Sequence, residues 1–286
     1  MKHASLSPFL KEIISDEYTF FWEVYAGKYR LSRGLTRRHR PAHESLPSSH
    51  ASHVTCRIRG KRNYAPFRQV PHLHRVFSNL SGENSILNFA STYGFLDYAR
   101  CVFTRPSSGI EGALIREPLE KLRTEIASMK SMLLRWDFIK SGSDIALNRV
   151  VEWRDDGVYF TIGRRSELIA ASDTEPYGRW LRQGKPLNEP AYHHIYNYVN
   201  SRLRGGVSPE VLPSYRRSLY LMPDSLLTAM WIMFMWELVG ETKPRACAIC
   251  GNWFNPQRST RKTCGDRCRK RLSRTSTGSR VTAYPD

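Results

Sequence analysis

Four of the six cysteines lie close together near the end of the chain, as two pairs. Cys247 and Cys250 are separated by two residues, and thirteen residues later come Cys264 and Cys268, separated by three. Two thiol pairs at this spacing can close a tetrahedral shell around one zinc ion, because thiolates are soft, strongly donating ligands. The sequence therefore predicts a C-terminal four-cysteine zinc finger at 243–274. The alternative is four reduced cysteines without a metal.

The residues around the four cysteines fit such a module. Gly251 directly follows the first pair and suits a tight turn in which backbone amides face the sulfurs. The spacing of Cys264 and Cys268 predicts two thiols one turn apart on a helix. Trp253 and Phe254 would supply a miniature core. Because a catalytic zinc normally keeps one position open and four cysteines fill the shell, the single zinc ion is predicted to be structural.

The chain is strongly basic, and the finger most of all. Its 286 residues carry a formal net charge of +18, with a pI near 9.9, which favours a polyanionic partner: DNA, RNA or an anionic membrane surface. A solvated basic face is the alternative. Contacts to phosphates give affinity without sequence choice, so this charge does not encode a target sequence. The predicted nucleic-acid-binding residues are Arg258, Arg261, Lys262, Arg267, Arg269, Lys270, Arg271 and Arg274.

Cysteine usage and the N-terminus point to a reducing compartment. Cys56 and Cys101 lie far from the cluster, which argues against a secreted disulfide scaffold. No apolar run of signal-peptide length follows Met1, since Lys11 and Glu12 begin a series of charged interruptions. A cytoplasmic location is expected, with association to the nucleoid if the partner is DNA.

The N-terminal third gives weak structural signals. Residues 1–32 are expected to form a segment with a short helix and then a strand or second helix. From 33 to 83 the composition favours a basic, flexible linker, in which Pro, Ser and His separate the cations and acids are scarce. Five of its histidines and Cys56 raise the alternative of a second metal site, but their spacing matches no zinc pattern; these histidines are His39, His43, His50, His53 and His72.

A mainly helical domain is expected at 84–240. Its clearest helix begins at Pro118 and repeats apolar residues at steps of three and four up to Ile139. Residues 226–239 are apolar on every side and too short to cross a bilayer, which predicts a central buried helix. Capping signals predict further helices at 85–93 and 190–204.

One β-hairpin is predicted near 150–162, where two short apolar runs flank Asp156-Gly157. The predicted fold class is therefore mainly α with a small β-hairpin (α+β): a helical domain followed by a small C-terminal four-cysteine zinc finger. Residues 275–286 are expected to be a disordered tail.

Enzymatic chemistry has no support in the sequence, and no catalytic residue is predicted. There is no glycine-rich phosphate loop and no Gly-x-Ser-x-Gly nucleophile motif. Asp155 and Asp156 adjoin a turn glycine, where acids usually serve the backbone. His193 and His194 are neighbours on a predicted helix and point to different faces, unlike a His-x-x-x-His metal pair.

The finger resembles a known group. Cys-x-x-Cys-Gly-x-x-Phe, a basic spacer and Cys-x-x-x-Cys-Arg-x-Arg are similar to the treble-clef-like zinc fingers at the C-termini of many bacterial proteins, and to the CGNR zinc finger family of stress-related transcription regulators. In that family a mostly helical domain precedes the finger, so the resemblance covers about residues 84–274. The tetrapeptide that names the family is absent, because Arg269-Lys270-Arg271 follows Cys268.

This resemblance implies a bacterial DNA-binding regulator of transcription with a helical sensor or interaction domain. The same charge also suits an RNA- or ribosome-associated zinc protein. A third possibility is a zinc-knuckle module that binds a protein partner, and self-association through the helical domain is a related option. Duplex DNA is the favoured partner, and no membrane association is expected.

Overall fold

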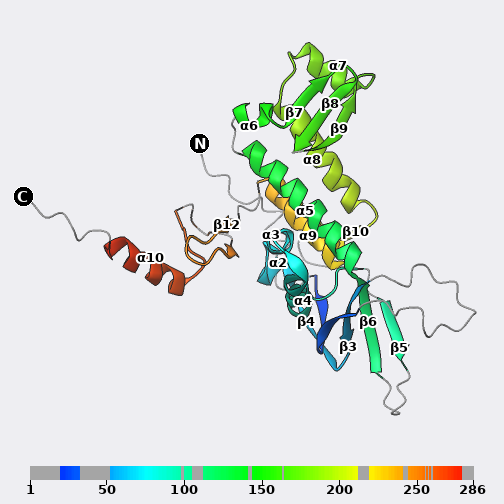
Figure 1. The fold of residues 1–286 in the computed structure, drawn as a ribbon, viewed down its shortest axis with the longest axis vertical. Coiled ribbons are helices and arrows are strands. Elements are labelled where there is room, and N and C mark those ends of the chain that lie inside the picture. Colours follow the sequence, from blue (N-terminus) through cyan, green and yellow to red (C-terminus); the bar gives the residue numbers. More distant parts are fainter. Residues whose placement is uncertain are drawn as a thin grey trace, which may run out of the picture. The chain divides into compact units, whose positions relative to one another are not determined.

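The structure is a computed structural model that describes residues 20–32, 52–97, 100–104, 112–140, 144–162, 164–211, 219–240, 244–254, 256, 258 and 260–278 (Figure 1). The chain divides into two compact units. Unit 1 comprises Met1–Ile126 and Val207–Asp286, and unit 2 is the continuous segment Ala127–Gly206.

The predicted fold class is wrong, because strands occur along most of the described chain and not in one hairpin alone. Strands form five separate sheets among the described residues, so the protein is a mixed α/β protein rather than a mainly α one. Most of these strands are short, and Gly60–Tyr64 carries two adjacent exposed cations where an amphipathic strand would alternate apolar and polar residues. The sequences of these strands therefore resemble that of a flexible linker and give no clear strand signal.

Unit 1 contains two antiparallel sheets from the N-terminal part of the chain. Strand β1 (Trp22–Ala26) pairs with β4 (Gly60–Tyr64). The second sheet has the order β2-β3-β6-β5, formed by the strands β2 (Tyr29–Ser32), β3 (His53–Arg57), β6 (Gly112–Pro118) and β5 (Arg100–Thr104). The basic linker expected at 33–83 is thus a folded part of the protein from β3 onward, while residues 33–51 lie outside the described residues.

Four helices and a hairpin complete the core of unit 1. They are α2 (Pro66–Gln69), α3 (Leu73–Ser78), α4 (Gly82–Tyr93), α9 (Leu226–Leu238), and the strands β10 (Val207–Val211) and β11 (Leu219–Pro223). The prediction of a central helix at 226–239 is confirmed, since twelve of the thirteen residues of α9 are buried. The hydroxyl of Ser225 accepts a hydrogen bond from the N–H of Thr228 at 3.1 Å and caps the helix.

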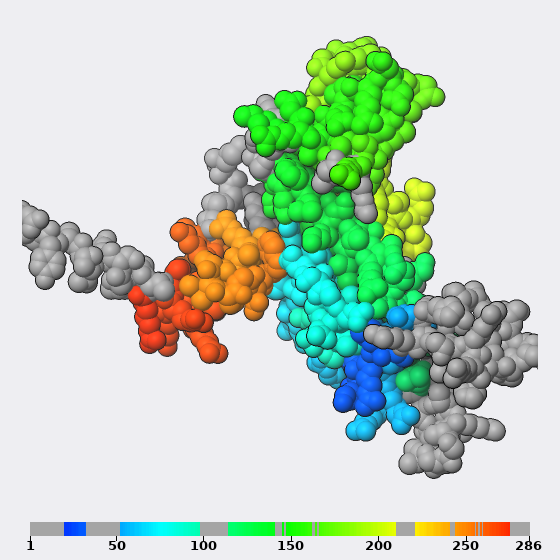
Figure 2. Space-filling view, in the orientation of Figure 1, coloured from blue at the N-terminus to red at the C-terminus, as the bar shows by residue number. Residues whose placement is uncertain are grey.

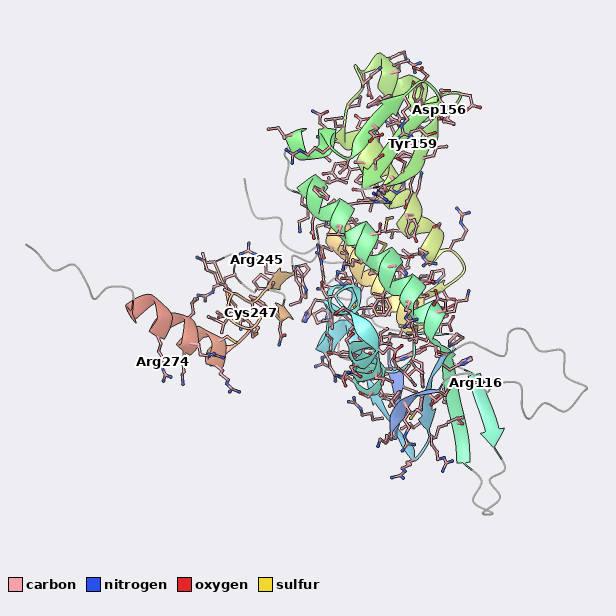
Figure 3. The ribbon with its side chains drawn as sticks, viewed as in Figure 1. Arg116, Asp156, Tyr159, Arg245, Cys247 and Arg274 are labelled. Atoms are coloured by element: carbon pink, nitrogen blue, oxygen red, sulfur yellow. The ribbon has the colours of Figure 1, made fainter. Side chains whose placement is uncertain are left out.

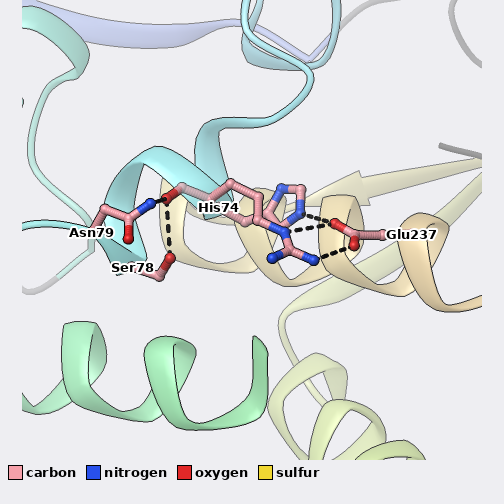
Figure 4. Close-up of polar contacts among 5 residues, drawn as sticks. His74, Ser78, Asn79 and Glu237 are labelled. Carbon is pink, nitrogen blue, oxygen red and sulfur yellow. Dashed lines mark hydrogen bonds and ion pairs between the residues drawn. The ribbon is translucent and has the colours of Figure 1, made fainter. Parts of the chain in front are cut away.

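An ion network lies inside this apolar core (Figure 4). Glu237 on α9 is buried, and its carboxylate accepts hydrogen bonds from His74 Nε2 and from Arg75 Nε, each at 3.0 Å. Arg75 Nη2 binds its other oxygen. The three residues therefore join α3 to α9 through a desolvated, charge-assisted contact. The single acid in an otherwise apolar helix was the only sequence signal of this network.

Unit 2 contains a three-stranded antiparallel sheet and helices. The strands β7 (Val151–Arg154), β8 (Gly157–Ile162) and β9 (Arg165–Ala171) pair in chain order. The predicted hairpin is present as β7–β8, with Asp155-Asp156 as its two-residue turn. Gly157 is needed for space, because a Cβ there would lie 2.6 Å from the carbonyl oxygen of Ala170. Strand β9 was not predicted.

The helices around this sheet are α6 (Asp144–Asn148), α7 (Glu175–Arg182) and α8 (Asn188–Leu203), together with the second half of α5 (Leu119–Lys140), which continues through the unit boundary. The predicted helix from Pro118 to Ile139 is confirmed as α5, and its apolar stripe is buried as expected. The buried members of the stripe are Leu119, Leu122, Ile126, Met129, Leu133, Trp136 and Ile139.

Arg135 of α5 is buried in unit 2 beside two titratable groups. Its Nη1 donates to Glu167 Oε2 at 2.7 Å and also contacts His194 Nε2, and its guanidinium lies over the ring of Phe160. Burial, followed by the charge of Arg135, lowers the pKa of His194 to about 4. The Arg135 hydrogen bond likewise holds the pKa of Glu167 below its usual range.

We expect His194 to titrate near pH 4 in the folded protein. Because its folded pKa lies below the unfolded value near 6.5, the unfolded chain binds the additional proton, and unit 2 loses stability as the pH falls from 6.5 toward 4. An NMR titration of the His194 ring protons measures this midpoint directly, and a midpoint above 6 would contradict its buried position beside Arg135.

Candidate metal centre

The first cysteine pair lies on a knuckle between two short strands. Strand β12 (Arg245–Ala246) pairs with β13 (Trp253–Phe254), and the chain reverses between them. Cys247 N–H donates to the carbonyl of Asn252 at 2.9 Å, and Gly251 N–H donates to the carbonyl of Cys247 at 2.9 Å. Gly251 has φ of 72°, which explains why glycine occupies this position.

The second pair lies at the start of helix α10 (Asp266–Gly278). Cys268 is in the first turn, whereas Cys264 precedes the helix, so the two thiols do not both lie on a helix as expected. Ala248 N–H donates to the carbonyl of Lys262 at 3.0 Å, which brings the approach to Cys264 against the knuckle. The positive end of the α10 dipole favours thiolates here.

The four sulfurs converge on one point. All four lie within 4.8 Å of one another, with 3.6 Å between the sulfurs of Cys250 and Cys264 and 3.7 Å between those of Cys264 and Cys268. A tetrahedral zinc site with Zn–S bonds of about 2.3 Å requires sulfur separations of about 3.8 Å. The cluster Cys247, Cys250, Cys264 and Cys268 can therefore hold one metal ion, and the four-thiolate donor set suits zinc.

Backbone amides favour the thiolate form of Cys247, which is the form that binds a metal. Burial raises its pKa, but hydrogen bonds from the backbone N–H groups of Cys250, Ile249 and Cys264 outweigh burial and bring the pKa down to about 6. The N–H of Cys264 lies 3.4 Å from this sulfur. In contrast, hydrogen bonding to Cys250 raises the pKa of Cys264 to about 12.

The finger has its own small core and a contact with α3. Phe254 and Thr263 are buried. The guanidinium of Arg75 lies 4.8 Å from the centre of the Trp253 ring, a cation–π contact that the sequence did not indicate. Arg75 thus contacts both the Glu237 carboxylate and the finger.

The predicted nucleic-acid-binding residues fall into distinct structural classes. Arg267, Lys270, Arg271 and Arg274 are exposed and recur at i, i+3, i+4 and i+7 on α10, so they share one helix face, which we call the basic stripe. Arg274 is labelled in Figure 3. Arg258 and Lys262 are exposed in the loop before α10.

Two other predicted nucleic-acid-binding residues, Arg261 and Arg269, form hydrogen bonds or an ion pair within the protein. Arg261 donates from Nε to the carbonyl of Thr263 at 3.0 Å and from Nη2 to the carbonyl of Cys264 at 2.9 Å, so it supports the loop that carries a predicted metal ligand. Arg269 pairs with Asp266 at 3.0 Å and lies on a different face of α10 from the basic stripe.

Comparison with protein-family models, curated proteins and solved structures found no match. The resemblance to the CGNR zinc finger therefore stays a sequence-based expectation, whereas the convergence of the four cysteines is a property of the structure. In the part of the chain that the structure describes, no helix combines the length and apolar character needed to cross a membrane.

Proposed function

We propose that this protein is a zinc-finger nucleic-acid-binding protein whose C-terminal helix contacts the phosphate backbone of duplex DNA. The observation that carries the proposal is the basic stripe, which begins one residue before the last cysteine of the cluster. A metal bound by the four cysteines would hold the start of α10 in place, and the cations that follow would face a polyanion.

The environment of the finger aromatics favours duplex DNA over unpaired RNA. Binding to unpaired bases usually relies on exposed aromatic rings on which the bases stack. Phe254 is buried, and the half-buried Trp253 has the Arg75 guanidinium over one face of its ring. Among its described residues the finger therefore exposes more charge than aromatic surface, which suits backbone contact with a duplex.

The binding mode predicts a specific change in salt dependence. Each phosphate contact contributes about 0.9 to the slope of log affinity against log salt, so Lys270→Gln with Arg274→Gln should lower the slope by about 1.8. Fluorescence anisotropy with a labelled mixed-sequence duplex at several salt concentrations measures this. Arg269→Gln is the matched control, because Arg269 is paired with Asp266, and its slope should stay near that of the parent protein. Equal slopes for all three proteins would rule out the stripe as a contact.

A role in transcription is the further part of this proposal and rests on the resemblance to the CGNR family. Selection of the zinc-loaded protein from a randomised duplex pool, near physiological salt, tests it. An enriched motif that is lost in Cys264→Ser would support a sequence-specific regulator. Retention without any enriched motif would leave only backbone binding.

A further inference from the structure

The four-stranded sheet of unit 1 carries arginines on one face. Arg30 on β2 lies opposite Thr55 on β3, and Thr55 lies opposite Arg116 on β6. Residues directly opposite in antiparallel strands share a face, and so do residues two apart along one strand. Arg30, Arg57 and Arg116 are therefore on the same face as Thr55, and Arg116 is labelled in Figure 3.

This face is the outer one. The alternate residues of the same strands point into the core, where Val54, Cys56 and Glu117 have no exposed surface and Ile115 is also buried. Arg30, Arg57 and Arg116 are all exposed. The alternation thus separates a buried inner face from an outer face that carries the exposed Arg57 and Arg116 on the two central strands.

A close turn adds two more cations at the end of this sheet. Arg59 N–H donates to the carbonyl of Ala26 at 2.9 Å, which ties the β3–β4 turn to the β1–β2 turn. Gly27 permits this approach, because a Cβ there would collide with the carbonyl oxygen of Arg57. Exposed Lys28 and Arg59 are brought near Arg57 as a result. Figure 2 shows residues 20–32 in blue beside the lighter blue of residues 52–64.

We call this set the sheet surface; its members are Lys28, Arg30, Arg57, Arg59 and Arg116. Among the described residues, none of the five forms an ion pair with a carboxylate. Some exposed arginines elsewhere do form ion pairs, such as Arg123 with Glu83 and Arg179 with Glu175. Like charges on adjacent strands repel each other, so a polyanion complements this surface.

We propose that the sheet surface is a second phosphate-binding surface, which contacts the backbone of duplex DNA independently of α10. The identity of the polyanion rests on the proposed function. Strands are about 4.8 Å apart, so Arg30 and Arg116, two strands apart, are about 10 Å apart at their backbones. Guanidinium groups bind phosphates through two parallel N–H donors, so each arginine can hold a separate phosphate. The surface would add affinity without reading bases.

The test uses the full-length, zinc-loaded protein and a labelled mixed-sequence duplex. Replacing Arg30, Arg57 and Arg116 with glutamine should lower the salt slope by about 2.7 and weaken binding about 100-fold at 0.15 M salt. The matched control replaces Arg123, Arg154 and Arg179 with glutamine, which removes the same charge from arginines paired with glutamates. A triple lysine variant at the three sheet positions should keep most of the affinity, and circular dichroism checks that each variant is folded.

The outcomes separate this proposal from the proposed function. If the salt slope is reduced in the sheet variant but normal in the α10 variants, the result supports the sheet surface and contradicts the proposed role of α10. If the α10 variants lose affinity for the duplex but the sheet variant binds it with an unchanged salt slope, the sheet surface does not contact DNA and the proposal is overturned. Loss of binding to anionic phospholipid vesicles in the sheet variant would not rescue it, because the vesicle is a different polyanion. Equal losses in the sheet variant and its charge-matched control also overturn it. If the parent protein does not bind duplex DNA in a salt-dependent way, both proposals fail.

Discussion

Replacement of Cys264 by serine is expected to abolish tight zinc binding and unfold the finger. The Cys264 sulfur lies 3.6 Å from that of Cys250 and 3.7 Å from that of Cys268, so its loss removes one of the four ligands of the tetrahedral shell. Binding free energies of structural zinc in small fingers are about 10–16 kcal/mol, and this energy is also the folding energy of the module. We expect one zinc per parent chain and an affinity more than about 100-fold lower in the variant.

Metal content and cobalt spectra measure this effect. Cobalt(II) bound by four thiolates in a tetrahedron gives characteristic visible absorption, which the parent protein should show and Cys264→Ser should lose. Cys56→Ala is the control, because Cys56 is a buried thiol in the N-terminal sheet, outside the cluster. If Cys264→Ser and the parent bind the same amount of metal with the same spectrum, the four-cysteine site is refuted.

Glu237→Ala should destabilise unit 1 by about 3–5 kcal/mol, because it leaves the buried Arg75 guanidinium without its carboxylate. Chemical denaturation at pH 7 measures this loss. Glu237→Gln should cost less, since an amide oxygen still accepts a hydrogen bond. Glu83→Ala is a control, because it removes a glutamate from an exposed pair with Arg123, and such pairs contribute about 0–1 kcal/mol. A Glu237→Ala loss no larger than that of Glu83→Ala would contradict the network.

The same network predicts acid sensitivity. Burial raises the pKa of Glu237, but hydrogen bonds from His74 and Arg75 outweigh it and bring the pKa to about 2, against 4.5 for the free side chain. A depressed carboxyl pKa gives stability that is present above 4.5 and is lost as the pH falls toward 2. Burial lowers the pKa of His74, so its contribution is lost as the pH falls below 6.5. In Glu237→Gln the free energy of unfolding should no longer depend on pH below 4.5 through this carboxyl group. The dependence above pH 4.5, which comes from His74, should remain.

Local patterns in the sequence were sufficient to predict some of the helices and one hairpin. The apolar periodicity of α5, the continuous apolar run of α9 and the β7–β8 hairpin are each contained in one short stretch, and each was predicted correctly. The turn of the hairpin is Asp155-Asp156, one residue earlier than the predicted Asp156-Gly157. The convergence of the four cysteines was predictable because ligand spacing reflects the geometry of the metal.

The N-terminal sheets were missed for a physical reason. Strand β3 pairs with β6, whose residues lie some sixty positions later, and it is only five residues long, too short for its alternation to stand out in the sequence. Pairing over such distances is decided by tertiary packing and leaves little trace in a local window. The contact of Arg75 with Glu237 spans 162 residues, so the sequence offered only the lone acid in α9.

Unit 1 is built from two separate segments of the chain, so its first segment is synthesised well before the second. Unit 2 is continuous in sequence and can fold as soon as it leaves the ribosome, whereas α2 and α3 must wait for α9 before their apolar sides are covered. At about 5–20 residues per second, the 162 residues between Arg75 and Glu237 take about 10–30 s to translate. During that interval the nascent chain exposes the apolar sides of α2 and α3 that α9 later covers.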